Sequence, residues 1–225
     1  MHTTMNKLRS FVSFAIVLTL LPAAGFAEDA KGALSNVVKA LGAENLKTLH
    51  YSGSGSSYIV TPDPAPAGGW PHTVMTSYVR DLNFQTITSR LWLTRNEGGT
   101  GGEQKIGHDI DATSPWDSQY EFWITPYGFL KAAMAHSATM ESKTILGTSY
   151  KVVTVTLPGN HNVVGYINDK DLIDRVETWI GERPVEASYS DYRDFNGVKV
   201  PMMITQKQAG QLSLILIVGE VRVDF

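Results

Sequence analysis

The chain has 225 residues, of which 43% are hydrophobic and 18% charged, and it contains no cysteine. The absence of thiols excludes disulfides, zinc–thiolate sites, thiol nucleophiles and a lipid anchor attached to cysteine, so stability must come from a buried core. The formal net charge of −3 comes without any run of basic residues, which argues against a nucleic-acid partner.

The N-terminus has the three parts of a secretory signal peptide. Lys7 and Arg9 form the positive region, residues 11–21 form the apolar region, and Gly25 and Ala27 are the small residues before the cleavage point. The apolar run is shorter than the roughly 20 residues of a membrane span, which favours a cleaved signal over an uncleaved anchor.

We therefore expect a signal peptide at residues 1–27 and a single domain at residues 28–225. Lys7 and Arg9 leave with the signal, so 17 basic and 22 acidic residues remain and the net charge becomes −5. No later stretch is long enough to cross a membrane, and we expect a periplasmic or secreted protein with no transmembrane segment after cleavage.

The first element after the signal is an amphipathic helix, predicted roughly from Ala30 to Leu41. Its apolar residues recur at helical spacing, and Gly42 follows as a natural stop. The residues of this apolar stripe are Leu34, Val37, Val38 and Leu41.

Most of the remaining chain has the composition and alternation of strands. Residues 73–96 predict two strands with a turn at residues 81–83, and residues 162–180 predict a hairpin with its turn at 168–171. Residues 49–60 and 150–157 also read as strands, the second with Val153, Val155 and Leu157 on one face.

The stretch from Tyr189 to Gln208 predicts a hairpin around Asn196-Gly197, a pair that tolerates the positive φ of a type I′ turn. Beyond the turn the even positions are apolar, which indicates one buried face. Residues 212–218 are apolar at nearly every position, so we expect that strand to be covered on both faces where it passes under a helix.

A second helix is predicted in residues 125–140, with Pro126 near its start and one face made of Phe129, Ala132, Ala133 and His136. With about eight to ten strands in local hairpin order and two helices, the fold class is mostly β (α+β). We expect a curved antiparallel sheet, or half-open β-barrel, wrapped around one or two helices.

Polar residues that could carry chemistry are few. His108, Asp109, Asp111 and Asp117 are near one another in the sequence and could hold a cation, although such aspartates more often bond turn backbones. The other histidines are scattered singly. We therefore predict no metal site and no cofactor.

A second polar candidate is the segment with Asp191 and Asp194 on either side of Arg193. Two carboxylates could serve acid–base chemistry, but a solvated strand end explains them more simply. The serines lack the sequence context of a nucleophile elbow. The glycine-rich segment GGTGG lacks the lysine that follows a phosphate-binding loop. We predict no catalytic residue and no enzyme activity.

The aromatic residues are more suggestive. Core packing explains most of them, and the alternative is that several line an apolar cleft between helix and sheet. The residues predicted to line such a cleft are Trp92, Trp123, Tyr127, Phe129 and Trp179.

Several longer segments resemble a known region. GYINDKDLIDRVETWI, PVEASYSDYRDFNGVKVPMMITQKQAG, WITPYGFLKAAMAHSAT and YSGSGSSYIV are similar to the N-terminal, non-catalytic region of exported bacterial metallo-β-lactamase-fold hydrolases, over about Ala33 to Val223. That region is similar in turn to the LolA-like and LppX-like fold, a half-open antiparallel barrel around helices that carries lipoproteins or lipids across the periplasm. The zinc-binding H-x-H-x-D-H signature of the catalytic domain is absent, so the resemblance implies only the accessory module.

Three functions remain open at this point. The first is a periplasmic, non-catalytic module that binds a lipid, an acyl chain or a lipoprotein group in its cleft. The second is a stand-alone accessory domain without a ligand of its own, with a separate hydrolase as its partner. The third, an enzyme built on His108, Asp109 and Asp111, has the least support.

Overall fold

The computed structural model describes residues 24–58, 70–96 and 102–225. The Pro- and Gly-rich residues 61–69 and the Gly-rich residues 97–101 fall outside these ranges, and so does most of the predicted signal peptide. Among the described residues, no helix combines the length and the apolar character needed to cross a membrane.

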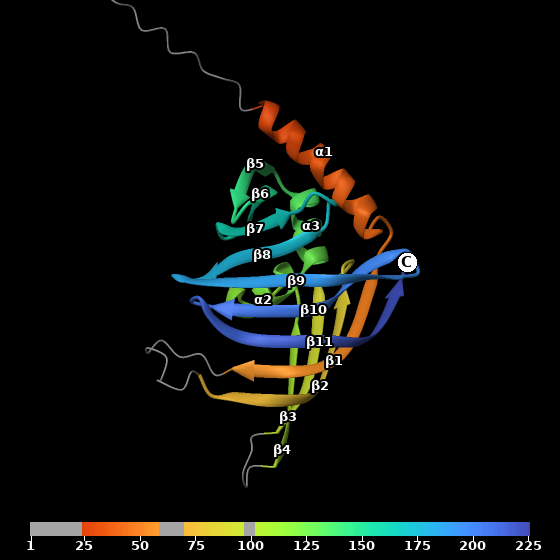
Figure 1. Ribbon diagram of the computed structural model, residues 1–225, viewed down its shortest axis with the longest axis vertical. Helices are drawn as coiled ribbons and strands as arrows, with labels where there is room; N and C mark the ends of the chain where they lie inside the picture. Colours follow the sequence, from red (N-terminus) through yellow and green to blue (C-terminus); the bar gives the residue numbers. More distant parts are fainter. Residues whose placement is uncertain (1–23, 59–69, 97–101) are drawn as a thin grey trace, which may run out of the picture.

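The described residues form three helices and eleven strands (Figure 1). The helices are α1 (Ala24–Leu41), α2 (Trp116–Trp123) and α3 (Pro126–Ala135). The strands are β1 (Thr48–Tyr58), β2 (His72–Asn83), β3 (Thr88–Asn96), β4 (Glu103–Ile110), β5 (Ala138–Ile145), β6 (Thr148–Leu157), β7 (His161–Ile167), β8 (Ile173–Ile180), β9 (Arg183–Phe195), β10 (Val198–Gln208) and β11 (Gln211–Asp224).

All eleven strands belong to one antiparallel sheet in the order β4-β3-β2-β1-β11-β10-β9-β8-β7-β6-β5. Every neighbouring pair except one is a pair of consecutive strands. The exception is the seam between β1 and β11, which pairs Thr48 with Asp224 and Ser57 with Leu214. The predicted local hairpin order is therefore confirmed on both sides of this single long-range pairing.

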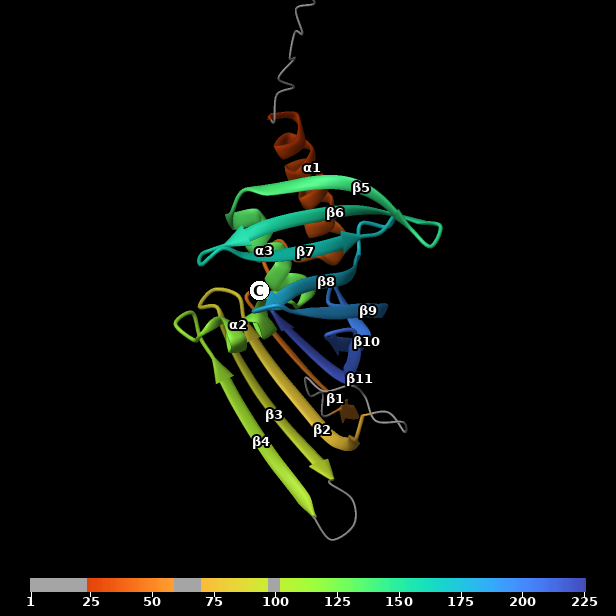
Figure 2. The same cartoon turned by 90° about the vertical axis from the view of Figure 1, so that its left-hand side faces the viewer.

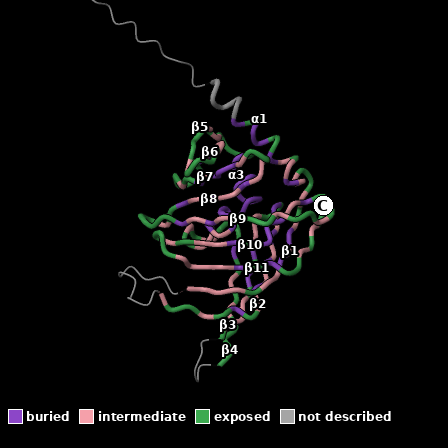
Figure 3. The backbone as a smooth tube through the Cα atoms, in the orientation of Figure 1, coloured by how far each residue is buried: buried purple, intermediate pink, exposed green. Residues whose placement is uncertain are grey.

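The sheet is strongly curved, and the two arms on either side of the seam run in different directions (Figures 1 and 2). Helices α2 and α3 lie in the hollow between the arms, and α1 packs against β5, β10 and α3. Buried residues gather around α3 and the strands beside it (Figure 3). The predicted fold class, a mostly β protein with a curved antiparallel sheet around helices, is confirmed.

The predicted Asn196-Gly197 hairpin is present, with Phe195 and Val198 paired across a two-residue turn. Both turn residues have positive φ, 54° for Asn196 and 88° for Gly197, as a type I′ turn requires. Gly42 also has positive φ at the end of α1, and a Cβ there would overlap the Gly197 carbonyl oxygen. The first helix is thus seated directly on this turn.

Two other predictions about strand faces and turns are confirmed. The turn at residues 168–171 joins β7 to β8, and the Asn168 side chain accepts hydrogen bonds from the backbone N–H groups of Lys170 and Leu172. Val153, Val155 and Leu157 are all buried on one face of β6.

The predicted turn at residues 81–83 is wrong, because β2 continues to Asn83 and the turn occupies residues 84–87. Leu82 is buried in the core, while the Asn83 side chain accepts hydrogen bonds from the N–H groups of Gln85 and Thr86. The polar residue that starts the turn is therefore Asn83.

The expectation that residues 212–218 are covered on both faces is also wrong. Leu216 and Val218 are buried beneath the helices, but Ile217 is 61% exposed on the opposite face. The predicted helix in residues 125–140 is too long, because α3 ends at Ala135 and β5 begins at Ala138. His136, predicted on the face of that helix, lies exposed at its C-cap. Helix α2 and strands β4 and β5 were not predicted at all.

Candidate ligand pocket

A pocket lies between the concave face of the sheet and the two inner helices. Leucine, isoleucine and valine side chains from both sides of the seam form its apolar wall, and Thr125, Pro126 and Tyr127 close it from the helix side. Its cavity volume is only about 20 Å³, room for a single water molecule. The apolar wall consists of Leu49, Leu82, Val200, Ile204, Leu214 and Leu216.

The inner helices pack closely against the sheet beside this pocket. Thr125 caps α3, since its hydroxyl oxygen accepts a hydrogen bond from the Gly128 N–H at 3.0 Å, and Pro126 occupies the first turn. The Phe129 ring lies against Gly165 of β7 so closely that a Cβ on Gly165 would overlap it. A larger side chain at 165 would therefore push α3 away from the sheet.

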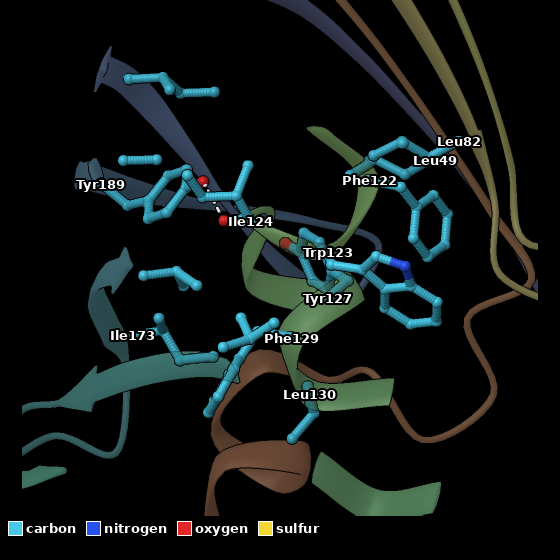
Figure 4. Close-up of a cluster of buried hydrophobic side chains, with 14 of the residues drawn as sticks. Leu49, Leu82, Phe122, Trp123, Ile124, Tyr127, Phe129, Leu130, Ile173 and Tyr189 are labelled. Atoms are coloured by element: carbon cyan, nitrogen blue, oxygen red, sulfur yellow. Dashed lines mark hydrogen bonds between the residues drawn. The ribbon is translucent and has the colours of Figure 1, made fainter. Parts of the chain in front are cut away.

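Tyrosine hydroxyls tie these helices to the sheet. The Tyr189 hydroxyl on β9 donates to the Ile124 carbonyl at 2.6 Å, just after α2 (Figure 4). The Tyr127 hydroxyl on α3 donates to the Lys199 carbonyl on β10. Each bond joins the helical segment to a different strand, so both must break before the helices can leave the hollow.

Burial raises the pKa values of several tyrosines well above the ordinary value. Desolvation is the largest cause for Tyr51, Tyr127, Tyr189 and Tyr192. Because the folded-state pKa exceeds that of the unfolded chain, these groups stabilise the fold fully at pH values below about 10.

We expect the free energy of unfolding to fall as the pH rises above about 10, because the unfolded chain then loses tyrosine protons that the folded state retains. Urea denaturation between pH 8 and pH 11, with tyrosinate absorbance recorded in parallel, measures both events. A Tyr127→Phe/Tyr189→Phe variant should lose less stability over this range. Ionisation of the buried tyrosines well before unfolding would contradict the prediction.

The strand side of this pocket also carries a charged residue. Arg80 on β2 is 3% exposed and lines the pocket. Its Nε donates to the Ser89 hydroxyl at 2.8 Å, and its Nη1 donates to Glu121 Oε2 of α2 at 3.0 Å and to the Tyr78 hydroxyl at 3.4 Å. Its Nη2 is buried without a hydrogen-bond partner.

Arg80 remains charged in this setting. Desolvation lowers its pKa, but the charge interactions with Tyr78 and Glu121 outweigh this and leave the pKa above its usual value. Glu121 differs from Arg80 in its access to water, because its side chain is 22% exposed. The pair therefore has one partner fixed in the protein interior and one that can reach solvent.

The structure brings only part of the predicted aromatic set together. Trp123, Tyr127 and Phe129 lie on the inner helices and are buried (Figure 4), and Tyr127 borders the pocket. Trp123 packs edge-on against Phe122 with ring centroids 5.0 Å apart.

Trp92 and Trp179 do not lie in the cleft, so their assignment to its lining is wrong. Successive side chains of a strand point to opposite faces of the sheet. Leu91 and Thr178 are buried on the inner face, so their neighbours Trp92 and Trp179 point to the outer face. Trp92 is 46% exposed beneath the Arg90 guanidinium, and Trp179 is 41% exposed.

The predicted polar candidates are not gathered into a site. Asp109 forms an ion pair with Arg90 at 3.4 Å, while Asp111 accepts hydrogen bonds from Thr113 and Ser114 that lower the pKa of its carboxyl. His108 lies on β4 opposite Leu91, and Asp117 lies in the first turn of α2. Within the described ranges, no three acidic or histidine side chains come together as metal ligands.

The two aspartates of the second polar segment, Asp191 and Asp194, have different structural roles. Asp191 forms an exposed ion pair with Arg193 at 2.8 Å. Asp194 instead accepts a hydrogen bond from the Gly197 N–H in the hairpin turn.

Arg80 and Glu121 are the residues that the sequence reasoning missed. A signal for Arg80 existed, because it shares the inward-facing alternate positions of β2 with Tyr78 and Leu82. A charged residue on the apolar face of a strand requires a buried partner. No comparable signal identified Glu121, because α2 itself was not predicted.

Comparison with protein-family models gives no match, and comparison with curated protein sequences gives none either. Among solved structures, the chain is similar to a LolA superfamily protein from Nitrosomonas europaea, with a TM-score of 0.52 and 12% identity over 87% of this chain and 94% of that one. It is also similar to a DUF1329 family protein from Desulfovibrio piger, with a TM-score of 0.47 and 8% identity over 87% of this chain and 93% of that one. A third similar structure is a putative outer membrane lipoprotein-sorting protein domain from Vibrio parahaemolyticus, with a TM-score of 0.47 and 8% identity over 86% of this chain and 93% of that one.

The similarity to the LolA superfamily protein defines the class of fold. The curved eleven-stranded antiparallel sheet with helices in its hollow is a LolA-like fold. The resemblance to the N-terminal region of metallo-β-lactamase-fold hydrolases stays a prediction.

Proposed function

We propose that residues 28–225 form one exported, non-catalytic domain that binds a hydrophobic ligand, a lipid or an acyl group, between the sheet and helices α2 and α3. The observation that carries this proposal is the pocket beneath α2 and α3, with its apolar wall and its closure by side chains from both helices. The LolA-like fold supports it, since a LolA superfamily protein has the same architecture.

Because this cavity holds only about 20 Å³, a ligand larger than a water molecule can enter it only if the helices move. Binding would move α2 and α3 outward and break the hydrogen bonds of Tyr189 and Tyr127 to the backbone. Each such bond contributes about 1 kcal/mol net, and the apolar surface that the helices leave would be covered again by the ligand. The hollow would thus exchange one apolar filler for another.

The test is the binding of an apolar fluorescent probe, together with native mass spectrometry of the purified protein to detect co-purified lipid. The wild-type protein should bind the probe stoichiometrically. The Tyr127→Phe/Tyr189→Phe variant, which lacks both ties, should bind it about tenfold or more tightly, because less free energy is spent on opening. Trp179→Phe, on the outer face, is the matched control and should bind like the wild type.

Absence of stoichiometric binding in both proteins would overturn the proposal. The alternative from the sequence, an accessory domain that acts beside a separate zinc hydrolase, would then explain the chain better. A pull-down with such a hydrolase would test that alternative.

A further inference from the structure

The Arg80–Glu121 pair sits where the ligand would enter. Arg80 belongs to the sheet and cannot reach water, whereas Glu121 belongs to α2 and is partly exposed. If α2 moves outward, Glu121 leaves with it and can be hydrated. Arg80 then remains as a charge on an apolar wall, a situation that is strongly unfavourable without a new partner.

The hydrogen bonding of Arg80 indicates what that partner must provide. Glu121 binds only Nη1, and Nη2 has no partner. The two terminal nitrogens of a guanidinium match both oxygens of one carboxylate, which is the strongest arrangement for this pair of groups. Glu121 therefore leaves one donor unused that a carboxylate bound end-on would satisfy.

The neighbouring polar groups offer no substitute. The Tyr78 hydroxyl already accepts from Nη1, and the Tyr189 hydroxyl donates to Ile124. The other polar residues of the lining are Tyr51, Thr125, Tyr127 and Gln206, none of which is a carboxylate, and the rest of the lining is apolar, with Leu82 and Leu216 among its residues. The site thus combines one fixed cation with surface suited to a hydrocarbon chain.

We propose that the ligand is a single-chain fatty carboxylate whose head group replaces Glu121 on Arg80, with its chain along the apolar wall. This inference rests on the proposed function and specifies its ligand class. Exchange of one carboxylate for another keeps the buried charge compensated while α2 is released. An uncharged lipid would leave Arg80 unpaired and should bind more weakly.

The experiment compares three probes of nearly equal length, namely decanoate, methyl decanoate and decyl methyl ether, by calorimetry at pH 7.5. Wild-type protein should bind decanoate at least about tenfold more tightly than the two uncharged probes. Arg80→Met should abolish this preference while still binding the uncharged probes. Glu121→Gln, which removes the competing carboxylate and keeps an acceptor for Nη1, should bind decanoate more tightly than the wild type.

Arg90→Met is the control, because Arg90 lies on the outer face over Trp92 and its removal should leave the preference unchanged. Equal binding of all three probes, or a preference for the ester, would overturn the carboxylate inference and leave the proposed function intact. Failure of every probe to bind would overturn both. The comparison of the three probes on the wild-type protein tests the carboxylate inference even if a variant does not fold.

Discussion

Replacement of Phe129 by alanine should lower the free energy of unfolding by about 3–5 kcal/mol, the range measured for large aromatic side chains in tightly packed cores. Phe129 is fully buried on α3, with the outer end of its ring (Cε1, Cζ and Cε2) against Gly165 and with Ile173 nearby (Figure 4). The backbone of β7 cannot collapse into the space, since it is held in the sheet by β6 and β8.

Urea denaturation followed by circular dichroism measures this loss. Met134→Ala is the control on the same helix, because Met134 is 51% exposed and its removal should change stability by less than about 0.5 kcal/mol. If Phe129→Ala cost no more than this control, the hollow would not be filled by α3. The closed state of the pocket would then have to be reconsidered.

The second large effect is expected from breaking the buried ion pair on one side only. Glu121→Ala should cost about 3 kcal/mol, because Arg80 would stay buried and charged with no carboxylate beside it. Arg80→Met should cost clearly less, because methionine fits the apolar wall and Glu121 can turn towards water. The asymmetry follows from the difference in exposure between the partners.

Glu220→Ala provides the reference for an exposed pair, because Glu220 and Arg222 are both mostly exposed. Its removal should change the free energy of unfolding by less than about 1 kcal/mol. Equal costs for Glu121→Ala and Arg80→Met in urea denaturation would show that the two partners are equally buried in solution, contrary to the structure.

Features of the fold that depend on local chemistry were predictable. The Asn196-Gly197 turn follows from the positive φ that these two residues tolerate, and the buried face of β6 follows from simple alternation. These properties belong to short stretches of chain, so neighbouring residues contain enough information to predict them.

The site depended on information that is not local. Alternation shows that Trp92 and Leu91 point to opposite faces of β3, but only the position of the helices decides which of these faces is the inner one. Similarly, the partner of Arg80 is 41 positions away, on a short helix whose residues have weak helical spacing. Such pairings are set by tertiary packing, which a single sequence does not display.

The seam between β1 and β11 also has a consequence for how the chain is made. Strand β11 is the last of the eleven described strands to be synthesised, yet it occupies a place near the middle of the sheet, between β1 and β10. Until β11 emerges from the ribosome, its two neighbours β1 and β10 each have an unpaired backbone edge that is open to aggregation. A nascent polypeptide of this kind should stay receptive to chaperones until residues 211–224 have emerged, and ribosome-stalled intermediates that lack these residues should be far more sensitive to protease than intermediates that contain them.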